Sequence, residues 1–175
     1  MDARLHYVQG KAERVTDILP LLVEFHREKL AMLLRHQAGA RLVGQYDVNN
    51  TYQYIINREE AQVSWLATAI AELGGTPLAV TGSDRTVSGR KDDASRQISE
   101  ADLRESQEFV DRWKPRVAAM KNARHARMLD VILGETLEQK RFFEQAVAGR
   151  TDLLGKRGEQ LAPSHGVVLS SRWIE

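Results

Sequence analysis

The sequence contains no cysteine, few aromatic residues and no long hydrophobic run. None of the 175 residues is Cys and only 6% are aromatic. The absence of cysteine excludes disulfide frameworks and thiolate zinc or iron–sulfur sites, and it favours a reducing compartment. Apolar stretches end well before membrane-spanning length, and the first residues lack the pattern of a secretory signal. We therefore predict a cytoplasmic protein that does not enter a membrane.

An excess of charge of either sign is also missing. The chain has 25 Lys and Arg against 24 Asp and Glu, interleaved along the sequence, for a net charge of +1. Nucleic-acid binding needs a clustered basic surface, so we predict no nucleic-acid partner. What remains is 42% hydrophobic residues, few β-branched runs and a length that suits one core. These features predict a single all-α domain over residues 1–175.

Four segments repeat apolar residues with the period of a helix. The first is predicted from about Asp17 to Gln37, with Pro20 in its first turn, and the second from the cap signal at 47–50 to Gly74-Gly75-Thr-Pro77. The third begins at about Ser99 and the fourth covers about Asn122 to Val147, with Gly149 near its end. The boundary between the last two stays open, because Pro115 either kinks the third helix or starts the fourth.

The connection between the second and third segments is unusually long. Residues 76–97 are rich in Gly, Ser, Thr, Asp and Arg and lack a helical period. A helix of about 25 residues is roughly 37 Å long, whereas 22 extended residues reach roughly 70 Å. The length predicts a four-helix bundle, about 17–148, of two antiparallel hairpins joined by one long crossover. A C-terminal extension, about 150–175, ends in an apolar stretch with Trp173 that we expect to pack on the bundle or on a partner.

Each predicted helix carries a carboxylate in or beside its apolar stripe. An isolated buried carboxylate is costly, so four converging ones would imply a cation. Glu59 lies between Ile55 and Leu66 on its stripe, and we predict that it is buried and faces Glu28. The four carboxylates are Glu28, Glu59, Asp102 or Glu105, and Glu135.

The spacing of these carboxylates suggests two versions of one helical hairpin. Glu28 and Glu59 are 31 residues apart, and Asp102 and Glu135 are 33 apart. The pair Glu105 and Glu138 is also 33 apart, which leaves the register open. We favour Asp102 with Glu135, because apolar residues follow Glu135 at the same offsets at which they follow Glu59.

These patterns resemble the ferritin-like superfamily, which includes bacterioferritins and rubrerythrins. The resemblance covers about residues 17–148 and is carried by three stretches: Glu28-Lys-Leu-Ala31, Arg58-Glu59-Glu60-Ala-Gln62-Val-Ser-Trp65-Leu running to Gly75, and Glu135-Thr-Leu-Glu138-Gln-Lys-Arg-Phe-Phe143. In such proteins a Glu from each of two helices and a Glu-x-x-His from each of the other two bind a pair of metal ions. Here Gln62 occupies the first His position, and Glu138, or Arg141 in the other register, occupies the second.

The resemblance implies a metal-carboxylate protein that binds iron or manganese for oxidation, peroxide reduction or iron handling. Its ligands would be Glu28, Glu59, Gln62, Asp102, Glu135 and Glu138, with His36 or His125 as replacement ligands. Loss of imidazole nitrogen weakens the preference for iron. The alternative is a metal-free scaffold or interaction protein, in which the carboxylates pair with arginines such as Arg58, Arg104, Arg124, Arg127 and Arg141. In either case we expect a homodimer, and the catalytic residues stay unknown.

Overall fold

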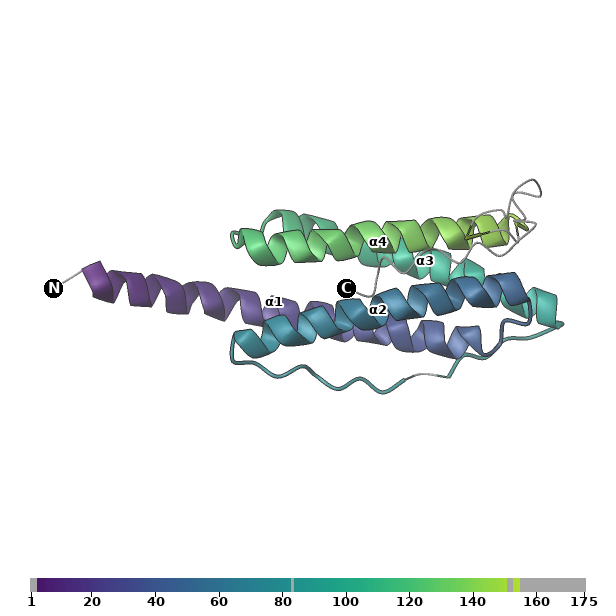
Figure 1. Cartoon of the computed structure of the whole chain (residues 1–175), viewed down its shortest axis with the longest axis horizontal. Coiled ribbons are helices and arrows are strands. Elements are labelled where there is room, and N and C mark those ends of the chain that lie inside the picture. The colour runs from purple at the N-terminus through teal and green to yellow at the C-terminus, as the bar shows by residue number, and fades with distance from the viewer. Residues whose placement is uncertain (1–2, 83, 151–152, 155–175) are drawn as a thin grey trace, which may run out of the picture.

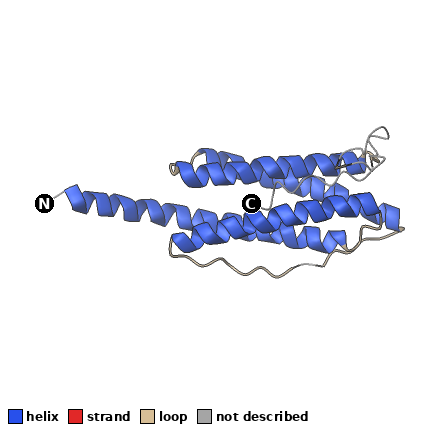
Figure 2. Cartoon of the chain, in the orientation of Figure 1, coloured by secondary structure: helices blue, strands red, loops and turns tan. Residues whose placement is uncertain are grey.

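The computed structural model describes residues 3–82, 84–150 and 153–154, with side chains from Ile18 onward except at positions 91 and 92. This part of the chain folds into four helices without a β-strand (Figures 1 and 2). The helices are α1 (Ala3–Ala40), α2 (Tyr46–Glu72), α3 (Lys91–Ala118) and α4 (Ala123–Val147). None of the described helices is both long and apolar enough to cross a membrane.

The helices form two antiparallel hairpins, as predicted. Helix α1 packs along α2, and α3 packs along α4 (Figure 1). The chain between α2 and α3 runs along the whole bundle and joins opposite ends of the two hairpins. The hairpins meet in an antiparallel seam between α2 and α4, where Glu72 pairs with Arg124 at one end and the ring of Tyr54 lies 6.0 Å from that of Phe142 toward the other. The predicted bundle and its long crossover are confirmed.

Two helices stop at a glycine, as the sequence indicated. Gly74 has a φ of 78°, a left-handed conformation that favours glycine. The Gly75 N–H donates to the Ile70 carbonyl and the Gly74 N–H to the Ala71 carbonyl, which satisfies two carbonyls at the end of α2. Gly149 ends α4 in the same way. At the start of α4, the Asn122 side chain accepts the His125 backbone N–H and caps the helix.

Three predicted helix starts were wrong. Helix α2 begins at Tyr46 with Gln45 as its N-cap, so residues 47–50 lie inside the helix and do not cap it. Helix α1 begins at Ala3 and continues through Pro20, which the sequence placed in a first turn. Proline removes one N–H from the helix but keeps a helical φ, and a long helix tolerates the loss when its other bonds persist. Helix α3 begins at Lys91 rather than near Ser99. Its first two turns bury small side chains, Ala94, Ser95 and Ser99, together with Ile98, so they lack an obvious apolar period. Pro115 lies in the last turn of α3, which settles the boundary with α4.

The core has two apolar clusters with polar groups between them. One cluster, toward the α3–α4 turn, includes Leu22, Phe25, Leu66, Trp113 and Leu129. The other, toward the α1–α2 turn, includes Leu33, Tyr52, Ile55, Ile98 and Phe143. Lys29, His36, Glu59 and Asp102 are also fully or almost fully buried. The helices thus place a charged group of residues in the middle of the bundle.

Helix α1 is longer than the bundle. A Cβ atom on Gly75 would meet Leu19, so Leu19 lies level with the end of α2. Ile18 and Leu21 line a groove together with residues of the α3–α4 turn. Residues 3–17 therefore continue beyond the ends of both hairpins (Figure 1).

Candidate functional site

A lysine occupies the centre of the bundle. The ammonium group of Lys29 is fully buried and donates to Glu59 Oε1 at 2.8 Å and to Thr136 Oγ1 at 3.3 Å. The sulfur of Met32 lies 3.6 Å from Nζ as a third acceptor. A lysine ammonium has three N–H donors, so these three acceptors satisfy it. Because the Thr136 hydroxyl donates its hydrogen bond to the Ile132 carbonyl, the lone pairs of its oxygen remain available to accept from the lysine.

Glu59 is fully buried, as predicted, and both its oxygens are engaged. Oε1 accepts from Lys29 and Oε2 lies 2.8 Å from His36 Nδ1. Burial alone raises the pKa of this carboxyl, but the charges of His36 and Lys29 outweigh it and lower the pKa to about 2. Glu59 is therefore a carboxylate held by two cationic partners from α1.

His36 links Glu59 to the second buried carboxylate. Its Nε2 lies 3.6 Å from Asp102 Oδ1, on the opposite side of the ring from Glu59. Burial lowers the pKa of His36, but Glu59 and Asp102 outweigh it, and the net effect raises the pKa above 6.5. The imidazole between two carboxylates is thus stabilised in its charged form.

Asp102 is completely buried, and Arg85 from the crossover forms an ion pair with it. The Tyr52 hydroxyl donates to Oδ2 at 2.5 Å, and the Arg85 guanidinium pairs with Oδ1. Burial and the neighbouring Asp102 raise the pKa of Tyr52 well above 10, so its hydroxyl keeps its proton. Arg85 also lies 3.7 Å from Glu105, which accepts from Arg35 at 2.5 Å. The crossover is therefore attached to the bundle through a buried ion pair.

The prediction that Glu28 faces Glu59 was wrong. Glu28 lies on the α1–α3 side, where it accepts the indole N–H of Trp113 at 2.9 Å and pairs with Arg112 at 3.0 Å. Its neighbour Lys29 turns inward in its place. Adjacent helical residues differ by about 100° in direction, so both can border the same stripe while only one enters the core.

Of the two carboxylates predicted at the centre of the second hairpin, only Asp102 on α3 lies there. Asp102 is fully buried, but Glu135 lies at the α2–α4 seam and pairs with Arg58, while Gln62 donates to it. Thr136, the next residue, takes the central position on α4. Glu138 is 67% exposed and lies 3.9 Å from Arg141, so it does not reach the centre.

Several buried polar atoms have no hydrogen-bond partner within the described residues. They are Gln62 Oε1, Ser106 Oγ and both amide atoms of Gln139 in the core, together with His26 Nδ1, Arg85 Nη1 and His125 Nε2. On α2 and α4 the buried polar residues repeat at i and i+3, as Glu59 with Gln62 and Thr136 with Gln139. This is the i, i+3 spacing of the Glu-x-x-His motif in di-metal bundles. On α4 it falls one residue later than predicted, with Thr136 in place of the glutamate and Gln139, rather than Glu138 or Arg141, in the histidine position.

The residues do not fit a di-metal centre. A metal ligand must offer a lone pair, whereas the ammonium of Lys29 offers only donors and a positive charge. Glu59 and Asp102 have each of their oxygens occupied by protein donors, and Glu135 pairs with Arg58. Among the described side chains, no three His, Asp or Glu residues converge to hold a metal ion.

Sequence reasoning missed Lys29, Tyr52, Arg85 and Thr136. A usable signal existed on α1, because Leu22, Phe25, Lys29, Met32 and His36 follow one another at spacings of three and four. The stripe through Glu28 has equally good spacing, so the period alone does not separate the two. No local signal marks Arg85, which lies in a connection.

The fold resembles that of a solved bacterial protein. No family model matches the chain, and no curated protein matches its sequence. The structure of a phenylalanine-to-glutamate mutant of Dps1 from Mycobacterium smegmatis aligns with a TM-score of 0.56 at 15% sequence identity, covering 77% of this chain and 97% of that one. At this identity the match speaks for the fold alone. The chain therefore has the ferritin-like fold, as a Dps-like four-helix bundle.

Proposed function

We propose that this protein is a metal-free ferritin-like bundle that works as a scaffold or interaction protein, as one cytoplasmic domain that assembles into a homo-oligomer. The observation that carries the proposal is the ion pair between Lys29 and Glu59 at the centre. In a di-metal bundle the buried carboxylates are neutralised by bound cations. Here Lys29 and His36 of α1 and Arg85 of the crossover neutralise the buried carboxylates instead.

The charge balance supports a structural use of the central residues. A buried charge persists only when it is paired and hydrogen-bonded. Glu59 and Asp102 each meet that condition through neighbouring helices or the crossover. With lysine, histidine and arginine already in place, an added divalent ion would face positive groups at close range. The central site is therefore suited to holding the helices in register.

The competing hypothesis is a metal-carboxylate protein that binds iron or manganese for redox or iron-handling chemistry. The observation in its favour is the group of buried polar atoms without partners on Gln62, Ser106 and Gln139. Amide and hydroxyl oxygens are ligands that hard cations accept. A water molecule would satisfy the same atoms, so this observation is weaker than the Lys29 pair.

Metal analysis combined with one matched pair of variants tests the proposal. Protein purified without a tag or chelator should contain far less than one iron or manganese per chain, and neither metal should raise its melting temperature. Glu59→Gln should lower the free energy of unfolding by roughly 3–5 kcal/mol with or without metal, because it leaves Lys29 and His36 with a neutral partner.

Glu28→Gln is the matched control, because Glu28 accepts from Trp113 near the surface and an amide oxygen still accepts. It should change the free energy of unfolding by less than about 1 kcal/mol. Stoichiometric metal in the wild type, lost in Glu59→Gln, would overturn the metal-free proposal. A strictly monomeric wild type in light scattering would overturn its oligomeric part.

A further inference from the structure

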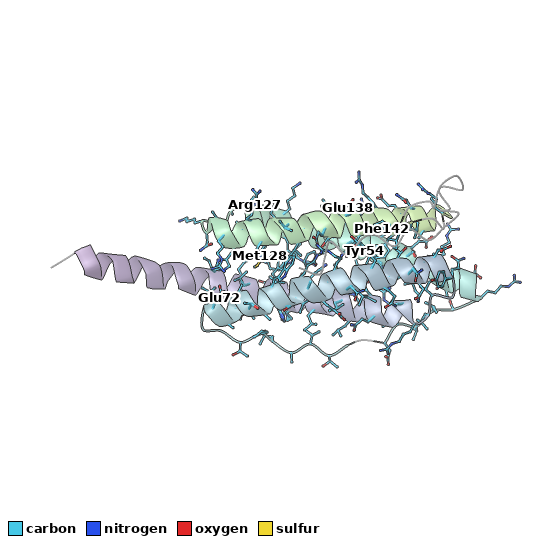
Figure 3. All side chains as sticks on the ribbon, viewed as in Figure 1. Tyr54, Glu72, Arg127, Met128, Glu138 and Phe142 are labelled. Carbon is cyan, nitrogen blue, oxygen red and sulfur yellow. The ribbon has the colours of Figure 1, made fainter. Side chains whose placement is uncertain are left out.

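The outer face of the seam between α2 and α4 gathers exposed apolar side chains. Tyr54 is 47% exposed, Trp65 41% and Val131 44%. Met128 lines a cleft with Trp65, the Phe142 ring packs edge-on against that of Tyr54, and both are partly exposed. In Figure 3, Tyr54 and Phe142 lie together toward one end of the seam and Met128 lies toward the other. Exposed aromatic and apolar side chains gathered on one face are typical of a protein interface.

Two contacts across the seam set which residues of the two helices lie level. Glu72 pairs with Arg124 at 3.0 Å, and the rings of Tyr54 and Phe142 lie 6.0 Å apart. Both helices advance by 18 residues from one contact to the other, so the two contacts agree. Because α2 and α4 are antiparallel and rise equally per residue, positions at equal distances from a contact lie level.

The residues between these contacts match in chemistry as well as in level. Seven residues in from the Glu72 contact, Trp65 of α2 lies level with Val131 of α4. Four residues in from the Tyr54 contact, Arg58 of α2 lies level with Glu138 of α4. Spacings of four and seven residues keep all of these positions on the seam side of their helices. Each α2 position on this face therefore has a complementary α4 position at its own level.

A two-fold axis parallel to the seam reproduces this match between two chains. Rotation about such an axis places α2 of one chain opposite α4 of a second copy at the same level. Trp65 then meets Val131 of the second copy, and Arg58 meets Glu138 of the second copy. A two-fold axis across the helices lacks this match, because the register that brings Tyr54 onto Trp65 also brings Glu138 close to Glu135, and like charges repel.

The charges on this face balance, so two copies can approach each other. Three ion pairs lie along the seam side, and each joins one arginine to one glutamate: Arg58 with Glu135, Arg141 with Glu138, and Arg124 with Glu72. Exposed pairs of this kind contribute little within one chain, but they add no net charge and can align with the same pairs of a second copy. Tryptophan, tyrosine and arginine are also the residues that contribute most to binding at interfaces.

We propose that this face binds a second copy of the chain, in a two-fold dimer in which α2 of each chain packs on α4 of the other. The inference rests on the proposed homo-oligomer and names the surface that forms it. Helices α2 and α4 have 27 and 25 residues. A face of about 38 Å by two helix diameters presents roughly 750 Å², close to the ~800 Å² that each partner buries in a standard interface.

A carboxylate placed on the apolar part of the face tests the interface. Val131→Asp and Trp65→Asp should each raise the dimer dissociation constant by roughly ten-fold or more in analytical ultracentrifugation, because each buries a charge against an apolar surface. Both residues are exposed in the single chain, so circular dichroism should still show a helical monomer. Leu137→Asp is the matched control, because Leu137 is also exposed on α4 but points about 200° away from Glu135 and the seam. It should leave the dissociation constant within about two-fold.

Charge exchange tests the arrangement of α2 on α4. Arg58→Glu should weaken the dimer, because it sets a carboxylate against Glu138 of the second copy. Glu138→Arg should weaken it in the same way with two guanidinium groups. An equal mixture of the two variants should regain a dimer close to the wild type in light scattering, because every contact between positions 58 and 138 then joins opposite charges.

The results separate this inference from the proposed function. Recovery in the mixture, with dissociation in Val131→Asp but not in Leu137→Asp, supports the dimer. An oligomer that survives Val131→Asp and Trp65→Asp would overturn this interface and leave the proposed scaffold standing. Two weakened variants that fail to recover on mixing would overturn the packing of α2 on α4. A monomeric wild type would overturn both the interface and the oligomeric part of the proposed function. The C-terminal extension with Trp173, predicted to pack on the bundle or on a partner, lies outside the described residues, and its packing on this face within one chain would give that monomer.

Discussion

The ammonium nitrogen of Lys29 lies 2.8 Å from Oε1 of Glu59, and neither side chain is exposed to solvent. This pair joins α1 to α2 at mid-bundle, and Thr136 extends the contact to α4. His36, which contacts Glu59 through one ring nitrogen, links this pair to Asp102 of α3 through the other. One buried pair therefore connects directly or through one residue to all four helices.

Lys29→Met should be strongly destabilising although methionine fits an apolar core. It removes the ammonium but leaves Glu59 buried with only His36 as a cationic partner. We expect a loss of roughly 3–5 kcal/mol in the free energy of unfolding by chemical denaturation. The double variant Lys29→Met with Glu59→Gln should lose less than the sum of the single variants, because it removes both charges together. Strict additivity would contradict a direct interaction between them.

The stability should depend on pH through His36 and Glu59. The pKa of His36 is raised in the folded protein, so its contribution is complete below about pH 6.5 and is lost as pH rises through the folded pKa. The pKa of Glu59 is lowered to about 2, so its contribution is present above about pH 4.5 and is lost as pH falls toward 2. Together they favour a maximum between about pH 4.5 and 6.5.

The histidine part of this pH dependence can be isolated by substitution. The pKa values of His26 and His125 are lowered, mainly by burial, so their contributions run the opposite way. The difference in unfolding free energy between wild type and His36→Gln removes those terms. This difference should shrink as pH rises from 6 to 9, and a difference that stays constant would contradict a charged His36.

Arg85→Met should loosen the crossover and destabilise the fold. The substitution leaves Asp102 fully buried without its guanidinium partner. We expect a loss of roughly 3 kcal/mol and faster amide hydrogen exchange in the crossover around residue 85. Arg96→Met is the control, because its pair with Glu100 is exposed and such pairs contribute little. Unchanged exchange in the crossover of Arg85→Met would show that the pair with Asp102 does not hold it.

Gly134→Ala should stabilise the protein, whereas Gly74→Ala should not. Gly134 lies within α4, where a Cβ atom would meet no other atom, and alanine favours a helix by about 0.5–1 kcal/mol over glycine. Gly74 also has open space around it, but its φ of 78° costs a residue with a Cβ about 1–2 kcal/mol. Melting temperatures of the two variants should therefore move in opposite directions.

The residues that predicted the fold act locally. Gly74 and Gly149 end helices because they adopt a left-handed conformation, and Asn122 caps a helix with its own side chain. The length of the polar connection after Gly75 limited the bundle to a topology with a long crossover. Each of these properties depends on neighbours in the sequence, so the sequence was enough to predict an all-α bundle with two hairpins.

The central residues could be predicted only in part. Glu59 and Asp102 were expected inside and are buried there, and so is Gln62. Glu28 and Glu135 were expected beside them and instead lie toward the surface next to Trp113 and Arg58. In both cases the adjacent residue, Lys29 or Thr136, points inward. A shift of one residue changes the direction on a helix by about 100°, and the apolar stripes were wide enough to accommodate either phase.

The sequence by itself determined the helical periods, their stops, the long crossover and the burial of Glu59. The tertiary structure alone decided that Lys29, His36 and Arg85 neutralise the buried carboxylates. Lys29 and Glu59 are 30 residues apart in the chain, and Arg85 comes from a connection without regular structure. A charge is stable in a core only beside its partner, and that partner is brought close only by the packing of the helices and the path of the crossover.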